Sequence, residues 1–332
     1  MFAVALAVTL VVASSGGGAL GGARGGSQSP AGSVRFDEFA PTTFSVVTRD
    51  ADKMAAAWAD VLGIAKPPIN QPEAVYPPNF EGDRAARPTM ASLQMANMTV
   101  SLHQPPTGRN YWRQTLEAHG EALYRMNFRV HGLADQTAYF ERKGGTLVIG
   151  DPAKVPYVNV NLWPKYGVAL ELNGVAADAP APSPRPVPPA GSFAGNPVFK
   201  IAFVVPNLNE AIRDYRELFG LPAPTTGTTP PLVFPESVKT DRKTTIAWAK
   251  MTFPNGVILE LNEPRGGASS WRDHLQKHGR SIYSVGFRVK SVHEQVAFLT
   301  SKGGVLVFGG PDARYAGFDF TSRLGTVLEI QE

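Results

Sequence analysis

The stretch WRQTLEAHGEALYRMNFRV at residues 112–130 is repeated as WRDHLQKHGRSIYSVGFRV at residues 271–289. The glycine pair at 144–145 and the run VALEL at 168–172 recur in the same order, as the glycine pair at 303–304 and the run VLEI at 327–330. Similarity that extends through half of a chain indicates a duplicated fold. The sequence therefore predicts two domains with one common architecture.

The length and composition support this division. The chain has 332 residues, enough for two domains of about 140 to 150 residues, and its 43% hydrophobic content can fill two cores. Residues 175–197 are rich in proline, with six prolines between 180 and 189 at positions 180, 182, 184, 186, 188 and 189, which favours an extended linker over a helix or a central strand. We expect a first domain at residues 36–174 and a second at 198–332.

Composition also excludes several kinds of function. The chain contains no cysteine, so disulfides, thiol nucleophiles and cysteine-ligated zinc are excluded. Its net charge of +4 comes from scattered basic residues, without the basic stripe that is typical of nucleic-acid-binding proteins. We therefore expect no nucleic-acid partner.

The N-terminal segment differs from the rest of the chain. Residues 2–13 form an apolar run, and small residues follow it, which is typical of a secretory signal. The run is shorter than the roughly 20 residues of a membrane span, so we expect no stable membrane insertion. No Lys or Arg precedes the run, which leaves two alternatives: a start of the protein that lies upstream, or a weak anchor. We expect residues 1–33 to be a signal peptide followed by a disordered Gly/Ser-rich segment, and the protein to be secreted or periplasmic.

Each half begins with the same local pattern. A short apolar strand, Phe44–Val47 or Ile201–Val205, leads to an N-cap residue, Asp50 or Asn207. An amphipathic helix follows in each half and ends at Gly63 or Gly220. Strand-rich segments come next, and a second strand and helix repeat the pattern within each half. The sequence predicts an α+β fold of four βαβββ modules.

Several segments resemble a known family. FSVVTRDADKMAAAWADVLGI and IAFVVPNLNEAIRDYRELFGL are similar to the opening strand and helix of vicinal oxygen chelate domains, the superfamily of glyoxalases, bleomycin resistance proteins and extradiol dioxygenases. GVALELNG, GVILELNEP and LGTVLEIQE resemble strands of that family on which a glutamate often ligates metal. The resemblance implies that two modules in each half pair into a curled mixed sheet, a cup with helices outside.

In this family, four side chains on the floor of the cup usually hold a divalent metal, which acts as a Lewis acid. The resemblance places Thr43, Ser101, Arg125 and Glu171 at these positions in the first half, and Lys200, Glu260, Ser284 and Glu329 in the second. Histidine, the usual ligand, is absent from all eight positions. If a metal is present, the resemblance leaves Glu260 and Glu329 as its ligands.

A fixed cation is expected where the metal would lie. Arg125 should face Glu171, and Lys200 should face both Glu260 and Glu329, because a buried carboxylate needs a partner. These ion pairs either stabilise the fold alone or also hold an anionic or dicarbonyl ligand.

Strand alternation adds further expectations for the two cups. His103 shares a face with Ser101, and Asp319 shares a face with Tyr315, so both should point into the cups. Tyr124 and Tyr283 should face outward, towards the helices. Gly317 stands at the position equivalent to Asn159 of the first half, so we expect the second cup to have more room there. We expect Trp112 and Trp271 to serve packing alone.

Two functions from different classes remain open at this point. The first is an exported protein that binds a small molecule in a cup that has lost most of the family's metal ligands, with no cofactor. The second is a metal-dependent enzyme, such as a glyoxalase-like lyase, an epimerase or an extradiol dioxygenase. One half could also be purely structural. The sequence identifies neither the ligand nor the oligomeric state.

Overall fold

The structure is a computed structural model that describes residues 40–78, 80, 82–176, 185–229, 234 and 244–332, all of them within one compact unit. The expected export segment at residues 1–33 lies outside the described residues and stays a prediction. Within the described ranges, no helix is long and apolar enough to cross a membrane.

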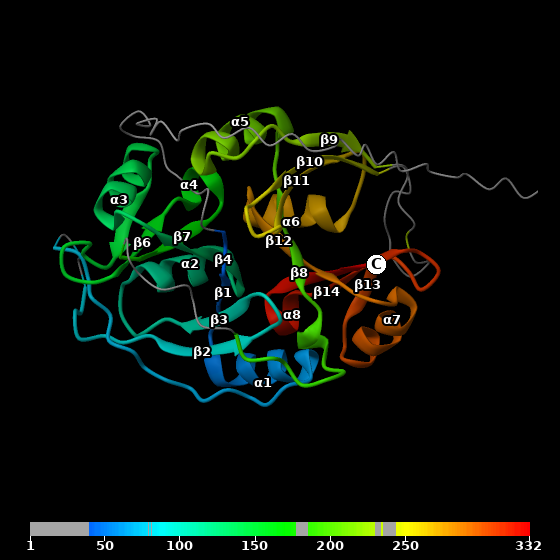
Figure 1. Ribbon diagram of the computed structural model, residues 1–332, viewed down its shortest axis with the longest axis horizontal. Helices are drawn as coiled ribbons and strands as arrows, with labels where there is room; N and C mark the ends of the chain where they lie inside the picture. Colours follow the sequence, from blue (N-terminus) through cyan, green and yellow to red (C-terminus); the bar gives the residue numbers. More distant parts are fainter. Residues whose placement is uncertain (1–39, 79, 81, 177–184, 230–233, 235–243) are drawn as a thin grey trace, which may run out of the picture. The chain divides into compact units, whose positions relative to one another are not determined.

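The first half forms a seven-stranded mixed sheet with the order β2-β3-β1-β4-β7-β6-β5 (Figure 1). Its strands are β1 (Thr43–Val47), β2 (Thr89–Gln94), β3 (Thr99–Gln104), β4 (Ala122–Val130), β5 (Thr146–Ile149), β6 (Tyr157–Asn161) and β7 (Ala169–Gly174). Its helices are α1 (Ala51–Leu62), α2 (Tyr111–His119), α3 (Leu133–Arg142) and α4 (Trp163–Tyr166).

The second half forms an eight-stranded sheet with the order β13-β14-β15-β12-β8-β11-β10-β9. Its strands are β8 (Val198–Val204), β9 (Thr225–Thr228), β10 (Thr245–Thr252), β11 (Ile258–Arg265), β12 (Ser281–Arg288), β13 (Val305–Gly309), β14 (Tyr315–Phe320) and β15 (Thr326–Gln331). Its helices are α5 (Leu208–Phe219), α6 (Ser270–His278), α7 (Val292–Ser301) and α8 (Thr321–Leu324).

The two sheets share one topology. The opening strand of each half, β1 or β8, lies parallel to the last strand of its own module and antiparallel to the opening strand of the next module, β4 or β12. One face of each sheet packs into an apolar core with the helices. The opposite, concave face carries polar side chains, and we call these faces the first cup and the second cup. The α+β class and the paired modules are as predicted.

The first module departs from the βαβββ pattern, because it has three strands where the others have four. The described part of residues 66–88 makes a single bridge, between Asn70 and Met90, in place of a strand. Six prolines in this segment, at 67, 68, 72, 77, 78 and 88, each remove a backbone donor, so a continuous ladder cannot form.

Local signals fixed the first helix of each half as expected. The side chain of Asp50 accepts a hydrogen bond from Lys53 N, and that of Asn207 accepts one from Glu210 N. Gly63 and Gly220 end these helices with φ of 67° and 61°, a left-handed conformation that glycine adopts without strain.

The two halves share one apolar core and exchange matching contacts. Trp58 of α1 donates its indole N–H to Leu324 O of α8 at 3.2 Å. Tyr215 of α5 donates its hydroxyl to Tyr166 O of α4, the equivalent contact in the opposite direction. Phe128 of the first sheet lies 5.6 Å from Phe219 of α5, centroid to centroid. The halves are therefore packed together through equivalent surfaces.

The segment that leads into the second half is partly packed. A short 3-10 helix at Phe193–Gly195 buries the side chains of Phe193 and Ala194 in the core. Arg185 donates hydrogen bonds to Thr42 O at 3.1 Å and to Thr99 Oγ1 at 3.0 Å. Residues 177–184 lie outside the described residues, so an extended linker there stays a prediction.

Candidate functional site

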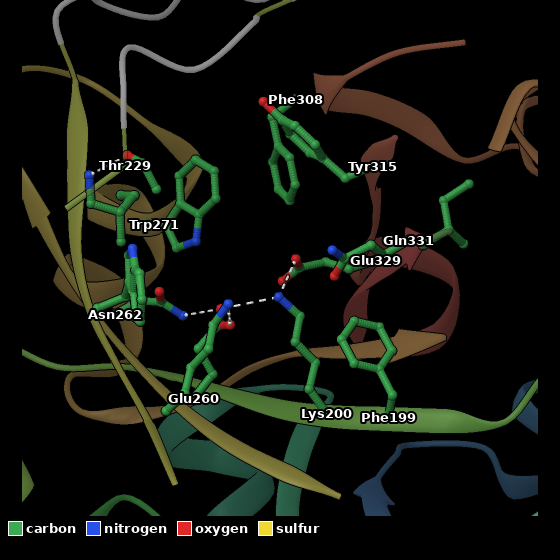
Figure 2. A pocket seen from close by; sticks show the side chains of 14 residues that line it. Phe199, Lys200, Thr229, Glu260, Asn262, Trp271, Phe308, Tyr315, Glu329 and Gln331 are labelled. Atoms are coloured by element: carbon green, nitrogen blue, oxygen red, sulfur yellow. Dashed lines mark hydrogen bonds and ion pairs between the residues drawn. The ribbon is translucent and has the colours of Figure 1, made fainter. Parts of the chain in front are cut away.

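The second cup contains a cavity of about 240 Å³ (Figure 2). Strands β8, β10, β11, β13, β14 and β15 line it together with the start of α6. The charged side chains of Lys200, Glu260 and Glu329 form one side, and the aromatic side chains of Phe308 and Tyr315 lie on the opposite side. We call these sides the ionic floor and the aromatic wall.

The ionic floor is centred on Lys200, which is buried. Its ammonium nitrogen lies 3.0 Å from Glu260 Oε1 and 2.8 Å from Glu329 Oε2, so the expected convergence of these three residues is confirmed. Ser284 donates its hydroxyl to Glu329, and Asn262 Nδ2 donates to Glu260 Oε1 at 3.1 Å. Ser284 thus supports the floor from beneath and does not line the cavity.

A second cation, Lys250 on β10, completes the floor. Its Nζ lies 3.3 Å from Glu260 Oε2 and 4.7 Å from the centroid of the Trp248 ring. Sequence analysis missed Lys250, because its role depends on the cross-strand pairing of Lys250 with Glu260. Only the register of β10 against β11 reveals this pair.

The expectation for Asp319 was wrong. Its carboxylate accepts hydrogen bonds from the backbone N and the hydroxyl of Thr321, at 2.7 and 2.6 Å, and does not line the cavity. Asp319 is the last residue but one of β14, so its side chain reaches the start of α8 instead of the cup. The floor therefore holds two carboxylates and two ammonium groups, without the surplus negative charge that three carboxylates would give.

The charges on the floor stabilise one another. Burial alone would raise the pKa of Glu260, but Lys200 and Lys250 outweigh it and lower that pKa to about 2. Burial alone would lower the pKa of Lys200, but Glu260 and Glu329 raise it above its ordinary value. Lys200 and Glu260 are therefore both charged near neutral pH.

Trp271 extends the aromatic wall of Phe308 and Tyr315. Its ring stacks on Phe308 with centroids 4.6 Å apart and an interplanar angle of 28°. We expected Trp271 to serve packing alone, but it also lines the cavity. Gly317 does not enlarge the cup as expected, because the Phe308 ring covers it so closely that a Cβ atom there would collide with the ring.

Tyr124 and Tyr283 also face the concave side, contrary to expectation. The pairing of β4 with β1 skips Tyr124, and the pairing of β12 with β8 skips Tyr283. Such a β-bulge places two consecutive residues on one face. Tyr283 consequently packs against Trp271, with centroids 5.6 Å apart, and shares a 2.8 Å hydrogen bond with Ser270 Oγ.

The first cup is centred on Arg125, which is buried. Its Nη1 lies 2.9 Å from Glu171 Oε2, so this expected pair is confirmed. Its other guanidinium nitrogens contact Ser45 Oγ at 3.3 Å and His103 Nε2 at 3.2 Å, and Nη1 also contacts Asn159 Oδ1. Every nitrogen of this cation thus has a partner within the cup.

His103 points into the first cup, as alternation predicted. Its Nε2 accepts from Arg125 and lies 2.8 Å from Ser101 Oγ, and its Nδ1 contacts the hydroxyl of Tyr124. Because Arg125 can only donate, Nε2 is the acceptor and Nδ1 carries the proton. Burial, with Arg125 beside it, lowers the pKa of His103 well below its ordinary value. His103 is therefore a neutral member of a closed network.

Thr43 does not take the place expected for it. It lies at the start of β1, opposite Asn127, and does not line the cavity of the first cup. Ser45, two residues later on the same face, contacts Arg125 instead. Asn127 Nδ2 donates to Glu171 Oε1 at 2.8 Å, so this amide assists the closing-strand carboxylate.

The first cup encloses about 230 Å³. Pro72, Glu73 and Ala74, from the segment at residues 66–88, line this cavity together with Trp112. We expected Trp112, like Trp271, to serve packing alone. The equivalent tryptophans thus line the cavities of both halves.

The donor set of the second cup does not fit a divalent metal. The ammonium group of Lys200 lies between Glu260 and Glu329, where an ion would have to bind. Among the described residues, no group of three or more His, Asp or Glu side chains is arranged to hold a metal ion. A divalent first-row metal usually needs three or four protein ligands.

Residues 199–321 match the model of the Glyoxalase/Bleomycin resistance protein/Dioxygenase superfamily. A mutant of 4-hydroxymandelate synthase from Streptomyces coelicolor is similar in structure, with a TM-score of 0.58 and 14% identity over 87% of this chain and 91% of that chain. A fusion of a xylose isomerase-like TIM barrel with 4-hydroxyphenylpyruvate dioxygenase has a TM-score of 0.50 and 14% identity, over 91% of this chain and 50% of that one. No curated protein matches the sequence.

Proposed function

We propose that this protein, whose residues 199–321 match the glyoxalase/bleomycin resistance protein/dioxygenase superfamily and which has the vicinal oxygen chelate fold, binds a small molecule in the second cup without a metal ion. In this proposal Lys200 has replaced the metal as the central cation of that cup. The first cup is structural and supports the second.

The difference between the two central cations carries this proposal. In the first cup every nitrogen of Arg125 is engaged, through contacts with Glu171, Asn159, Ser45 and His103. In the second cup Lys200 pairs with two carboxylates, and Lys250 pairs with one. The four contacts of Arg125 use all but one of the five donors of a guanidinium, whereas the three contacts of Lys200 and Lys250 use half of the six donors of two ammonium groups, so the second cup keeps more donors available for a ligand. A cavity that combines apolar walls with a few polar groups is typical of ligand sites.

A compound screen on the full chain tests this proposal. Ligands should shift the NMR signals of second-cup residues and raise the melting temperature. Trp271→Ala should abolish these effects, and the equivalent substitution in the first cup, Trp112→Ala, should preserve them. If the NMR shifts and the rise in melting temperature are instead lost in Trp112→Ala and kept in Trp271→Ala, the ligand binds in the first cup and the proposal is wrong.

The alternative, a metal-dependent enzyme, makes a different prediction. It requires Glu260 and Glu329 to leave Lys200 and bind a metal together with ligands from elsewhere. Elemental analysis of the purified protein should find less than one equivalent of Mn, Fe, Ni or Zn per chain. A stoichiometric, tightly bound metal would favour the enzyme over the binding protein.

Export is a separate part of the proposal. The apolar run at residues 2–13 and the small residues after it support a secreted or periplasmic location. Mass spectrometry of protein from its natural host should find a mature N-terminus between residues 14 and 33. An intact Met1 on a cytoplasmic protein would contradict this part and leave the binding proposal unaffected.

A further inference from the structure

We propose that the second cup selects an uncharged, planar aromatic ligand that carries a hydrogen-bond acceptor, such as a carbonyl oxygen, at one end. This inference rests on the proposed function and specifies its ligand class. Three features of the cavity lead to it: the balance of charge on the floor, the direction of the remaining hydrogen bonds, and the shape of the aromatic wall.

The charge on the ionic floor is balanced. Among the described residues that line the cavity, the charged ones are Lys200, Lys250, Glu260 and Glu329, whose formal charges sum to zero. Each carboxylate lies within 3.0 Å of the Lys200 ammonium group. A charged ligand would find no unpaired opposite charge there, and burial of an unpaired charge is strongly unfavourable. A neutral ligand avoids this cost.

The hydrogen bonds of the floor favour an acceptor on the ligand. Glu260 Oε1 accepts from Lys200 and Asn262, and its Oε2 lies against Lys250. Glu329 Oε1 accepts from Ser284, and its Oε2 lies against Lys200. All four carboxylate oxygens are therefore engaged, whereas both ammonium groups have more donors than these contacts use. A carbonyl oxygen on the ligand matches what the floor has left to offer.

The aromatic wall favours a flat ring. Trp271 and Phe308 stack, and the Tyr315 centroid lies 6.4 Å from that of Phe308. Phe308 lies closely over Gly317, which has no Cβ atom to lift the ring away from the sheet. Trp248 also lines the cavity. Aromatic rings bind planar rings by offset stacking or edge contacts, beyond the gain from burial alone.

Four one-ring probes separate these features. Benzamide is neutral, planar and carries an acceptor; benzoate is its anionic counterpart, benzylammonium a cationic one, and cyclohexanecarboxamide a saturated one. Each probe is titrated into the full chain, and binding is followed through the tryptophan indole N–H signals by NMR. We expect benzamide to bind at least about tenfold more tightly than each of the others.

Two substitutions test the charge balance of the floor and the contribution of the aromatic wall separately. Lys250→Met should leave the floor with one surplus negative charge and shift the preference from benzamide to benzylammonium. Phe308→Leu should reduce the preference for benzamide over cyclohexanecarboxamide. The equivalent position in the first cup is Ile149, and Ile149→Leu should change neither preference.

The possible results distinguish this inference from the proposed function. Tighter binding of benzoate or benzylammonium to the unsubstituted chain would overturn the ligand class and leave the second cup as a binding site. Equal binding of cyclohexanecarboxamide would overturn the aromatic requirement alone. If none of the probes binds, the ligand class is wrong, and the compound screen then decides separately whether the second cup binds any small molecule.

Discussion

Lys200 lies across Gly286, its cross-strand partner on β12, so closely that a Cβ atom on Gly286 would lie 2.5 Å from Lys200 Cγ and 2.9 Å from Lys200 Cε. The equivalent residue on β4 is Asn127, which faces the short side chain of Thr43. The long lysine of the second cup and the glycine beneath it therefore form a matched pair. A larger residue in place of Gly286 would collide with Lys200, and a shorter residue in place of Lys200 would leave a gap above Gly286.

Replacement of this glycine should displace the cation. Gly286→Ala should destabilise the protein by about 1 to 3 kcal/mol, because Lys200 is held by two carboxylates and cannot move aside freely. Urea denaturation measures the change, and ligand binding in the second cup should weaken with it. Gly195→Ala is a matched control, since no atom lies within 4 Å of a Cβ at that position, and it should change stability by less than about 0.5 kcal/mol.

Removal of the central cation should leave two buried carboxylates without their main partner. We expect Lys200→Met to cost about 3 kcal/mol or more in the free energy of unfolding. The double variant Lys200→Met with Glu260→Gln should cost clearly less than the sum of the single variants, because the partners are then removed together. Costs that add within about 0.5 kcal/mol would contradict the contact between these residues.

A histidine cluster should make stability depend on pH. His274 lies beside His278, with ring centroids 4.6 Å apart, and shares a 2.9 Å hydrogen bond with Ser281 Oγ. Burial, together with His278 and Lys277, lowers the pKa of His274 from 6.5 to about 3. Burial and the charges of Lys277 and His119 lower the pKa of His278 to about 4.

The direction of this dependence follows from proton linkage. Between about pH 6.5 and these lower values, the unfolded chain binds protons that the folded chain does not, so the free energy of unfolding falls as the pH falls. His274→Gln should reduce the slope of unfolding free energy against pH between about pH 4 and pH 6. The reduction should exceed that in His293→Gln, the matched control at an exposed position. An unchanged slope in His274→Gln would contradict the prediction.

The matching contacts between the halves should make them unfold together. Tyr215→Phe removes the donor to Tyr166 O and should cost about 1 to 3 kcal/mol, because it leaves a buried carbonyl without that partner. Calorimetry should show a single transition for the protein and for the variant, whose melting temperature should be lower. Two separate transitions in the unsubstituted protein would show that the halves are thermodynamically independent.

Local sequence signals and the family resemblance together predicted the architecture, apart from the strand that the first module lacks. The repeat at residues 112–130 and 271–289, the N-cap residues Asp50 and Asn207, and the glycines that end the first helices are signals read within short windows. Their physical causes are local: backbone donors at a helix start and the left-handed conformation at its end. The resemblance to a known family then supplied the pairing of modules that local signals cannot give.

The composition of each cup depended on contacts between distant segments. Arg125 with Glu171, and Lys200 with Glu260 and Glu329, could be expected because the family resemblance places them at its metal-ligand positions. Simple alternation failed for Tyr124 and Tyr283, because a β-bulge shifts the pattern by one residue.

The sequence by itself determined the duplicated fold, which follows from its repeats, and its family resemblance implied the central cation of each cup. Only the tertiary structure decided how many donors of each central cation are already engaged. Lys250 reaches Glu260 through the register of β10 against β11, and Phe308 covers Gly317 through the packing of β13 on β14. Register and side-chain packing are set jointly by segments far apart in the chain, so no local stretch of sequence contains them.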